Sequence, residues 1–213
     1  MTDTVRKGRR RLVSDEEILQ AAFEAFAVTD YDAMSVRQLN AALGLSHETV
    51  RQRFGSKRDL YRAALDHGVA RFYGLLAEER MALPAAADDL GELRYMTRAF
   101  ITASMRLPQL ANLVNHEAAS AGERLDYIFS TGFAPGMTLF AEMLDGLVAR
   151  GVIYPITVRD AFFIIDAGMS PFIQPALSGA FDAVAGSLDV ATHVDSFLDF
   201  VFRGLVRPST SNP

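Results

Sequence analysis

Residues 35–57 read SVRQLNAALGLSHETVRQRFGSK, and their spacing predicts two short helices joined by a tight turn. Ser35 and Gln38 form a capping box, after which apolar residues recur at the spacing of one helical face. Gly44 can take the left-handed conformation that ends a helix, and Ser46 is a good cap for the next helix. The two expected helices cover residues 36–42 and 47–54.

The second expected helix has a narrow apolar face and a wide polar face. Val50 and Phe54 are its core positions, so the remaining side chains are free to meet a partner. A helix with Arg, Gln, His and Thr on its outer face has the size and the donors to lie in the major groove of DNA. A helical hairpin of this length also occurs as a packing unit with a solvated charged face. The DNA-contacting residues that we expect in this hairpin are Ser35, Arg37, Ser46, His47, Glu48, Thr49, Arg51, Gln52 and Arg53.

Two flanking features favour DNA as the partner. Ser56 and Asp59 form a further capping box, so backbone N–H groups and Lys57 lie at a helix N-terminus, which suits a phosphate oxygen. Upstream lies a basic arm that could follow the phosphate backbone or enter a minor groove. Its basic residues are Arg6, Lys7, Arg9, Arg10 and Arg11.

The net charge of −5 is divided unevenly along the chain. Residues 1–62 contain 11 Lys and Arg against 9 Asp and Glu, whereas residues 63–213 contain 10 against 17. Attraction to phosphate is therefore concentrated at the N-terminal end, and repulsion of the acidic remainder would orient the molecule on DNA.

A fixed order of features runs from Ser14 onward. An apolar helix to about Val28 is followed by Ser35-Val36-Arg37, Ala42-Leu43-Gly44-Leu45-Ser46, Thr49-Val50 and Phe54-Gly55-Ser56-Lys57-Arg58-Asp59-Leu60. This order, over residues 14–62, resembles the N-terminal domain of the TetR family of bacterial transcriptional regulators. The resemblance implies that Thr49 and Lys57 contact phosphates and that exposed positions of the second helix read bases.

Two positions depart from that family's pattern. Glu48 and Arg51 stand where such proteins often carry a small residue and an aromatic, so an aromatic contact to phosphate cannot be carried over to position 51. Arg51 could read a guanine or hold a phosphate. Glu48 could accept from a cytosine amine or pair with Arg51 or Gln52, and we favour the pairing.

The rest of the sequence predicts helices. No stretch alternates at a period of two, and no glycine-rich phosphate loop is present. The further expected helices cover residues 14–28, 56–83, 90–105, 108–119, 122–150 with an interruption or kink at Pro135, 157–172 and 190–206. The predicted fold is therefore all-α. An N-terminal three-helix helix-turn-helix domain, residues 1–62, is joined by a long helix to a C-terminal helical ligand-binding and dimerisation domain, residues 63–213.

Composition indicates a globular cytoplasmic protein. Half of the residues are apolar, which allows a large core, yet no apolar run reaches the roughly 18 residues of a membrane helix. The N-terminus lacks the apolar segment of a secretory signal, so we expect no membrane partner. The chain has no Cys, which excludes disulfides and thiolate zinc sites.

Catalysis is not expected. His47-Glu48 and His116-Glu117 both begin like a zinc-protease motif, but Arg51 and Ser120 stand where the second His is needed. We therefore expect no metal, no cofactor and no enzymatic activity. The rival to a regulator is a helical architectural or protein-interaction module that reads no DNA sequence.

Two apolar sets in the second half exceed what one small core needs: Leu144, Leu147 and Val148 on one expected helix, and Phe162, Ile165, Met169 and Phe172 on the next. The two sets could belong to a helical core, or they could pair with their symmetry mates as a two-fold four-helix interface, as the resemblance to the TetR family implies. A two-fold partner would place two reading helices about one DNA turn apart, roughly 34 Å. We therefore expect a homodimer on a double-stranded DNA operator.

A further group of apolar residues predicts a pocket for a small apolar effector of unknown identity. Its residues are Phe72, Met96, Phe100, Leu113, Phe133 and Met137, with His116, Asn115 and Glu117 as polar groups at the wall. His116 could equally be a surface or interface residue whose hydrogen bonds are satisfied. The resemblance implies that a bound effector tilts the long helix and releases the operator, at a coupling of about 1–3 kcal/mol. The sequence identifies neither the operator nor the controlled genes, and it does not separate a repressor from an activator.

Overall fold

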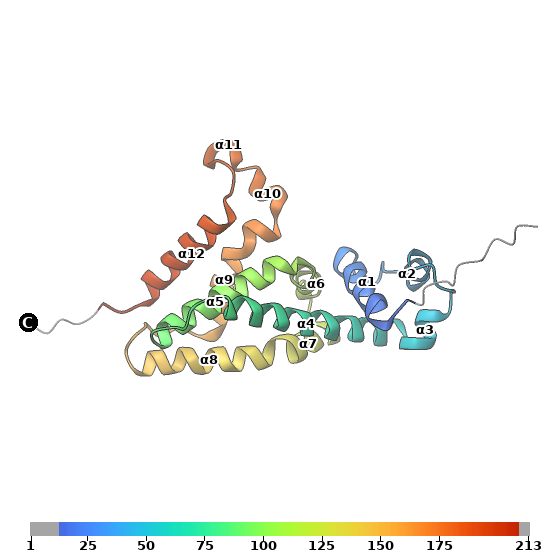
Figure 1. Ribbon diagram of the computed structural model, residues 1–213, viewed down its shortest axis with the longest axis horizontal. Helices are drawn as coiled ribbons and strands as arrows, with labels where there is room; N and C mark the ends of the chain where they lie inside the picture. Colours follow the sequence, from blue (N-terminus) through green and yellow to red (C-terminus); the bar gives the residue numbers. More distant parts are fainter. Residues whose placement is uncertain (1–12, 209–213) are drawn as a thin grey trace, which may run out of the picture. The chain divides into compact units, whose positions relative to one another are not determined.

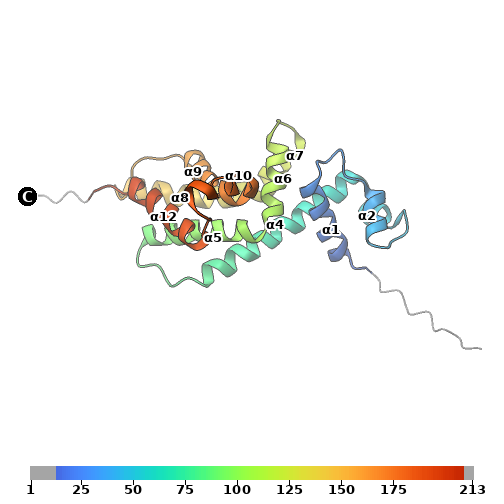
Figure 2. The ribbon, with the colours of Figure 1, turned by 90° about the horizontal axis from the view of Figure 1, so that it is seen from above.

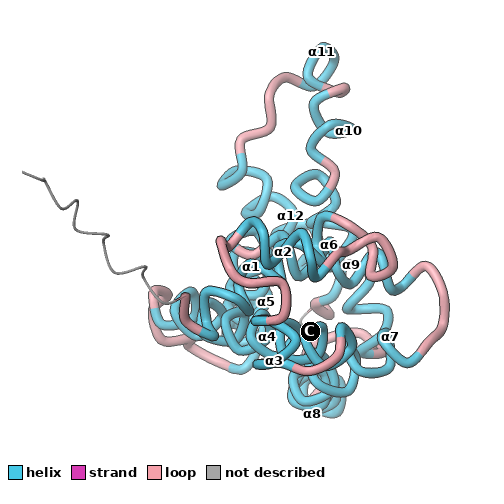
Figure 3. Tube along the Cα trace, turned by 90° about the vertical axis from the view of Figure 1, so that its right-hand side faces the viewer, coloured by secondary structure: helices cyan, strands magenta, loops and turns pink. Residues whose placement is uncertain are grey.

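The computed structural model describes residues 13–208, and all of their regular structure is helical (Figures 1 and 3). These residues form two compact units, one extending to His67 and the other beginning at Gly68. Within the described range, β-type pairing is limited to one isolated antiparallel bridge between Ile153 and Val206. The all-α prediction is thus confirmed. No helix among these residues has both the length and the apolar character to cross a bilayer.

The first unit contains three short helices and the start of a long one. Their bounds are α1 Asp15–Val28, α2 Val36–Ala42, α3 Thr49–Phe54 and α4 Lys57–Met81. The capping box at Ser14 is complete, because the Ser14 hydroxyl accepts from the backbone of Glu17 while the Glu17 carboxylate accepts from the backbone of Ser14. Ile18, Ala22 and Phe23 are fully buried from the same face of α1. Burial of each large side chain contributes about 1.5–3 kcal/mol, so this core stabilises the unit.

The second unit contains the remainder of α4 and the helices that follow. These are α5 Asp89–Arg106, α6 Pro108–Ala118, α7 Glu123–Ile128, the π-helical turn η1 Phe129–Phe133, α8 Ala134–Ala149, α9 Val158–Ile173, α10 Pro175–Gly179, α11 Asp182–Ala185 and α12 Val190–Leu205. Helices α5, α8, α9 and α12 pack together around one apolar core (Figures 1 and 2). Arg94 and Arg98 on α5 form ion pairs with Asp199 and Asp195 on α12, which fix the two helices in register.

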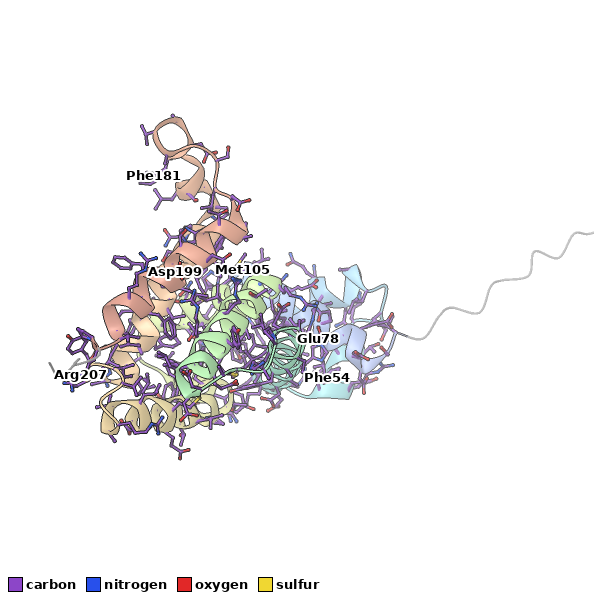
Figure 4. The ribbon with its side chains drawn as sticks, turned by 60° about the vertical axis from the view of Figure 1, so that its left-hand side comes forward. Phe54, Glu78, Met105, Phe181, Asp199 and Arg207 are labelled. Carbon is purple, nitrogen blue, oxygen red and sulfur yellow. The ribbon has the colours of Figure 1, made fainter. Side chains whose placement is uncertain are left out.

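The structure differs from the prediction at three places. Helix α3 begins at Thr49 rather than at residue 47, because residues 47 and 48 form a turn and the Ser46 hydroxyl bonds to the Thr49 hydroxyl instead of capping backbone. The expected helix over residues 122–150 is divided by η1, which precedes Pro135. Helices α10 and α11 were not predicted. They project away from the other helices of the second unit, and Figure 4 labels Phe181 on this projection.

Candidate functional site

Asn40 is the buried polar residue that sets the geometry of the α2–α3 hairpin. Its side-chain amide donates to the carbonyl oxygens of Val36 at 3.1 Å and His47 at 3.0 Å, while its Oδ1 accepts from the backbone N–H of Val50 at 3.3 Å. Asn40 is fully buried, so loss of these bonds would leave unsatisfied backbone groups. The amide therefore fixes the turn and the N-terminal end of α3 to α2. Sequence reasoning missed this residue, although a polar residue on the apolar side of α2 was a signal.

The outer face of α3 is exposed, as predicted from the spacing of Val50 and Phe54. Val50 is 1% exposed, whereas Arg51 and Gln52 lie on the surface. Ser46, His47 and Glu48 on the preceding turn are also exposed. Together with Arg37 on α2, these side chains form one polar surface, which we call the α3 face: Arg37, Ser46, His47, Glu48, Arg51 and Gln52.

Glu48 does not form the pairing that we favoured. Within the described residues, no ion pair or hydrogen bond joins its carboxylate to Arg51 or Gln52. The side chain also gives no capping bond to α3. Arg51 and Gln52 are consequently available to an external partner.

Four expected DNA-binding residues hold the hairpin in place through contacts within the protein. Arg53 donates to the carbonyl oxygen of Val13 at 2.8 Å and forms an ion pair with Asp15 at 3.1 Å. The Lys57 ammonium donates to the carbonyl oxygen of Asp32 and lies 4.7 Å from the ring centroid of Tyr31. The two remaining residues use their hydroxyls: Ser35 caps α2 and Thr49 bonds to Ser46. The predicted basic arm, with Arg9, Arg10 and Arg11, lies outside the described residues.

The second unit contains an apolar cavity of about 290 Å³. Helices α4, α5, α6, α8 and α9 and the turn η1 all contribute to its wall. The predicted residues that line it are Phe72, Met96, Phe100, Phe133, Met137 and Asn115. Aromatic rings meet edge to face across the wall, with centroids 5.6 Å apart for Phe72 and Phe100.

Three predicted pocket residues on α6 do not line the cavity. Leu113 is 2% exposed and packs on another side of the helix, and His116 is on the surface. Glu117 is buried and accepts two hydrogen bonds from Arg124, at 2.7 and 2.8 Å. The prediction was wrong by about one position along α6, because one residue turns a side chain by 100° around a helix. The residues of α6 that face the cavity are Leu110, Ala111, Val114 and Asn115.

The residues predicted for the dimer interface are buried or half-buried in the second unit, and their place in a dimer stays a prediction. Leu144 and Leu147 are each 2% exposed, and Val148 and Phe172 pack against the same core. Phe162, Ile165 and Met169 line the cavity. Among the large apolar side chains of α9 and α12, those exposed are Phe163, Ile164, Val190 and Phe200.

Asp166 is a cavity residue that the sequence reasoning missed. It lies on α9 between Ile165 and Met169, and it is the charged residue among those that line the cavity. Burial raises the pKa of its carboxyl above the ordinary value of 3.8. A carboxylate within the apolar stripe of a helix was the sequence signal for this position.

The hairpin with its exposed α3 face, followed by a helical unit with a cavity, defines the class of helix-turn-helix transcriptional regulators. The family model described as bacterial regulatory proteins, tetR family, matches residues 18–64. The HTH-type transcriptional repressor Rv3405c of Mycobacterium tuberculosis and the HTH-type transcriptional regulator Mb3439c of Mycobacterium bovis are each 30% identical over 161 residues, which cover 68% of this chain and 85% of each relative. This chain belongs to the TetR family of bacterial regulatory proteins.

Solved structures show the same fold. A TetR family transcription regulator from Marinobacter aquaeolei VT8 has a TM-score of 0.67 at 14% identity, covering 90% of this chain and 94% of that one. HlyIIR, a hemolysin II transcriptional regulator, has a TM-score of 0.61 at 19% identity, covering 90% of this chain and 96% of that one. The predicted family and fold class are both confirmed.

Proposed function

We propose that this regulator is a repressor that binds a palindromic operator as a homodimer and leaves it when a small apolar molecule enters the cavity. DNA binding is assigned to the first unit and effector binding to the second, in line with the predicted division into residues 1–62 and 63–213. The name of the mycobacterial relative, a repressor, supports the direction of control.

The observation that carries this proposal is the continuity of α4. The helix begins at Lys57, three residues beyond the end of α3 at Phe54, and its later turns contribute Val69, Phe72 and Tyr73 to the cavity wall. One continuous helix thus follows the reading hairpin in the chain and contributes side chains to the cavity wall. A shift of α4 that changes operator affinity five- to 150-fold requires a coupling of only about 1–3 kcal/mol.

DNA reading is assigned to the α3 face. The side chains of Arg51 and Gln52 are exposed, form no hydrogen bond or ion pair with the described residues, and carry the donors that read guanine and adenine edges in the major groove. Arg53 and Lys57 are assigned mainly to positioning, because both already donate to the protein's own backbone. Ser35 and Thr49 keep exposed hydroxyl lone pairs that suit water-mediated contacts to phosphate.

Dimerisation is assigned to the exposed apolar side chains of α9 and α12. Phe163 is 62% exposed, Ile164 41% and Phe200 79%, and a monomer gains nothing from displaying them to water. A two-fold axis at this surface would bury the three side chains against their copies.

The test of the proposal measures operator affinity with and without apolar compounds. A duplex enriched from random DNA by the full-length protein is labelled, and its dissociation constant is measured by fluorescence anisotropy. A repressor of this kind binds the duplex at nanomolar concentration and loses about fivefold or more of its affinity when a compound fills the cavity. An architectural module would yield no preferred duplex, and a regulator without a sensor would show the same affinity with every compound.

A further inference from the structure

The polar groups of the cavity are almost all hydrogen-bond acceptors. The hydroxyls of Tyr73, Thr97 and Ser104 each donate, at 2.8 Å, to backbone carbonyl oxygens of the second unit. Their protons are therefore occupied, and their oxygens have only lone pairs left for a ligand. Among the lining side chains, Asn115 alone retains free N–H donors, and it lies at the surface.

Asp166 adds a formal negative charge to this set of acceptors. Its carboxylate is half-buried, and no described residue gives it a hydrogen bond or an ion pair; the Ser170 hydroxyl bonds to the backbone oxygen of Asp166 and not to its carboxylate. The raised pKa of this carboxyl has burial as its cause, with no neighbouring charge contributing. An unpartnered carboxylate in an apolar cavity is costly, so a ligand that supplies a positive charge would offset that cost.

The aromatic lining also favours a cation. Phe72, Phe100, Phe133 and Phe162 expose ring surfaces in two edge-to-face pairs, with centroids 5.6 and 5.8 Å apart. The faces of such rings carry partial negative charge and attract ammonium groups within about 6 Å of the centroid. An anionic ligand would instead meet acceptors, ring faces and the carboxylate.

We propose that the effector of this regulator is a hydrophobic amine, with its protonated nitrogen bound by the Asp166 carboxylate and its apolar body in the cavity. The proposal rests on the proposed function, because it names the class of ligand for the same cavity. At about 290 Å³ the cavity is at the small end of ligand pockets, so the apolar body is short.

The test compares three probes that share one ten-carbon chain: decylamine, decan-1-ol and decanoate. Binding to the full-length protein is measured by isothermal titration calorimetry at neutral pH. We expect decylamine to bind about 10- to 100-fold more tightly than decanol, the gain of a hydrogen bond to a charged group, and decanoate to bind more weakly than either. The variant Asp166→Asn should bind decylamine and decanol with similar affinity.

The control addresses nonspecific attraction of a cation to an acidic protein. Asp145→Asn removes an equal charge from an exposed position on α8 that does not line the cavity, and it should keep the preference of the wild-type protein for decylamine. Equal binding of amine and alcohol to the wild-type protein would overturn the inference while leaving an apolar effector in place. A preference that persists in Asp166→Asn, or tighter binding of decanoate, would also overturn it. If none of the three probes binds, both this inference and the sensor role of the cavity fail.

Discussion

The ring of Phe197 on α12 lies directly against Gly168 on α9. A Cβ atom at Gly168 would lie 2.2 Å from Cζ of Phe197, closer than any real contact, and the Gly168 carbonyl oxygen also contacts the His193 ring at 3.1 Å. The two helices can therefore approach this closely only because position 168 has no side chain.

Gly168→Ala should destabilise the second unit by about 1–3 kcal/mol, because the added methyl group must displace the Phe197 ring or separate the helices. Urea unfolding followed by circular dichroism measures the change. The matched control is Gly74→Ala, at an exposed position of α4 where a Cβ meets no neighbour. That variant should gain about 0.5–1 kcal/mol from helix propensity. Equal stability of Gly168→Ala and the wild-type protein would contradict the packing described.

Asn40→Ala should destabilise the first unit by about 1–3 kcal/mol, because the carbonyl oxygen of His47 and the N–H of Val50 lose their buried partner. Asn40→Asp should be worse at neutral pH, since a buried carboxylate would face two carbonyl oxygens. Both variants should bind the operator more weakly. Gln38→Ala, at an exposed position on the same helix, is the control. Retention of full operator affinity by Asn40→Ala would show that the amide does not position α3.

Arg51→Ala and Gln52→Ala should each lower operator affinity by about 1–3 kcal/mol, the discrimination of one good base contact, while leaving the melting temperature unchanged. Arg53→Ala should instead affect the stability of the protein more than its choice of DNA sequence. Its ion pair with Asp15 is partly exposed, so we expect a loss of stability of no more than about 1 kcal/mol and little change in which sequence is preferred. Anisotropy with the preferred duplex and a scrambled duplex separates the two effects.

Asp166→Asn should stabilise the ligand-free protein at neutral pH. Because burial raises the folded-state pKa of Asp166, folding opposes its ionisation, and stability is lost as the pH rises through that pKa. The variant does not ionise, so its advantage in melting temperature should shrink as the pH is lowered toward the ordinary value of 3.8.

Asp199→Asn should change the melting temperature at neutral pH in the opposite direction to Asp166→Asn. The hydrogen bond from Arg94 holds the pKa of Asp199 below its ordinary value, so this carboxylate stabilises the fold above that value and the contribution is lost on acidification. The variant should therefore melt below the wild-type protein at neutral pH, with a difference that disappears in acid. The same pH dependence for both variants would be inconsistent with the two environments.

Phe163→Glu and Phe200→Glu should each convert the dimer to a monomer, because each places a charge in the interface assigned to α9 and α12. Light scattering should then give a mass near the 23.3 kDa of one chain. Val184→Glu, at a position on α11 that is 84% exposed, should leave the dimer intact. If the wild-type protein is monomeric at micromolar concentration, this result contradicts the interface assigned to α9 and α12.

Local signals made much of the fold predictable. The caps at Ser14, Ser35, Asp88 and Thr157 are formed between residues three positions apart, so the starts of the helices that follow could be read from the sequence. Helices α10 and α11 are too short to produce a periodic pattern. The π-helical turn at residues 129–133 could not be predicted either, since Tyr73 contacts it from a distant part of the chain.

The sites were predictable only where one face of a helix is apolar. On α3 the spacing of Val50 and Phe54 leaves one outward face, so the sequence predicts which residues of this helix are exposed. On α9 two apolar faces compete, with Phe162 and Ile165 inward and Phe163 outward, and periodicity does not say which face meets a partner. Which of the two faces meets a partner therefore stays a prediction.

Selection of bound sequences from a random DNA pool, with wild-type protein and Arg51→Ala in parallel, tests the central claim most directly. We predict that the wild-type protein enriches a near-palindrome whose half-sites are centred about one helical turn apart, roughly 10 base pairs, and that Arg51→Ala loses the preference at one position of each half-site. A wild-type pool without any enriched sequence, or an identical motif from both proteins, would contradict the reading of DNA by the α3 face.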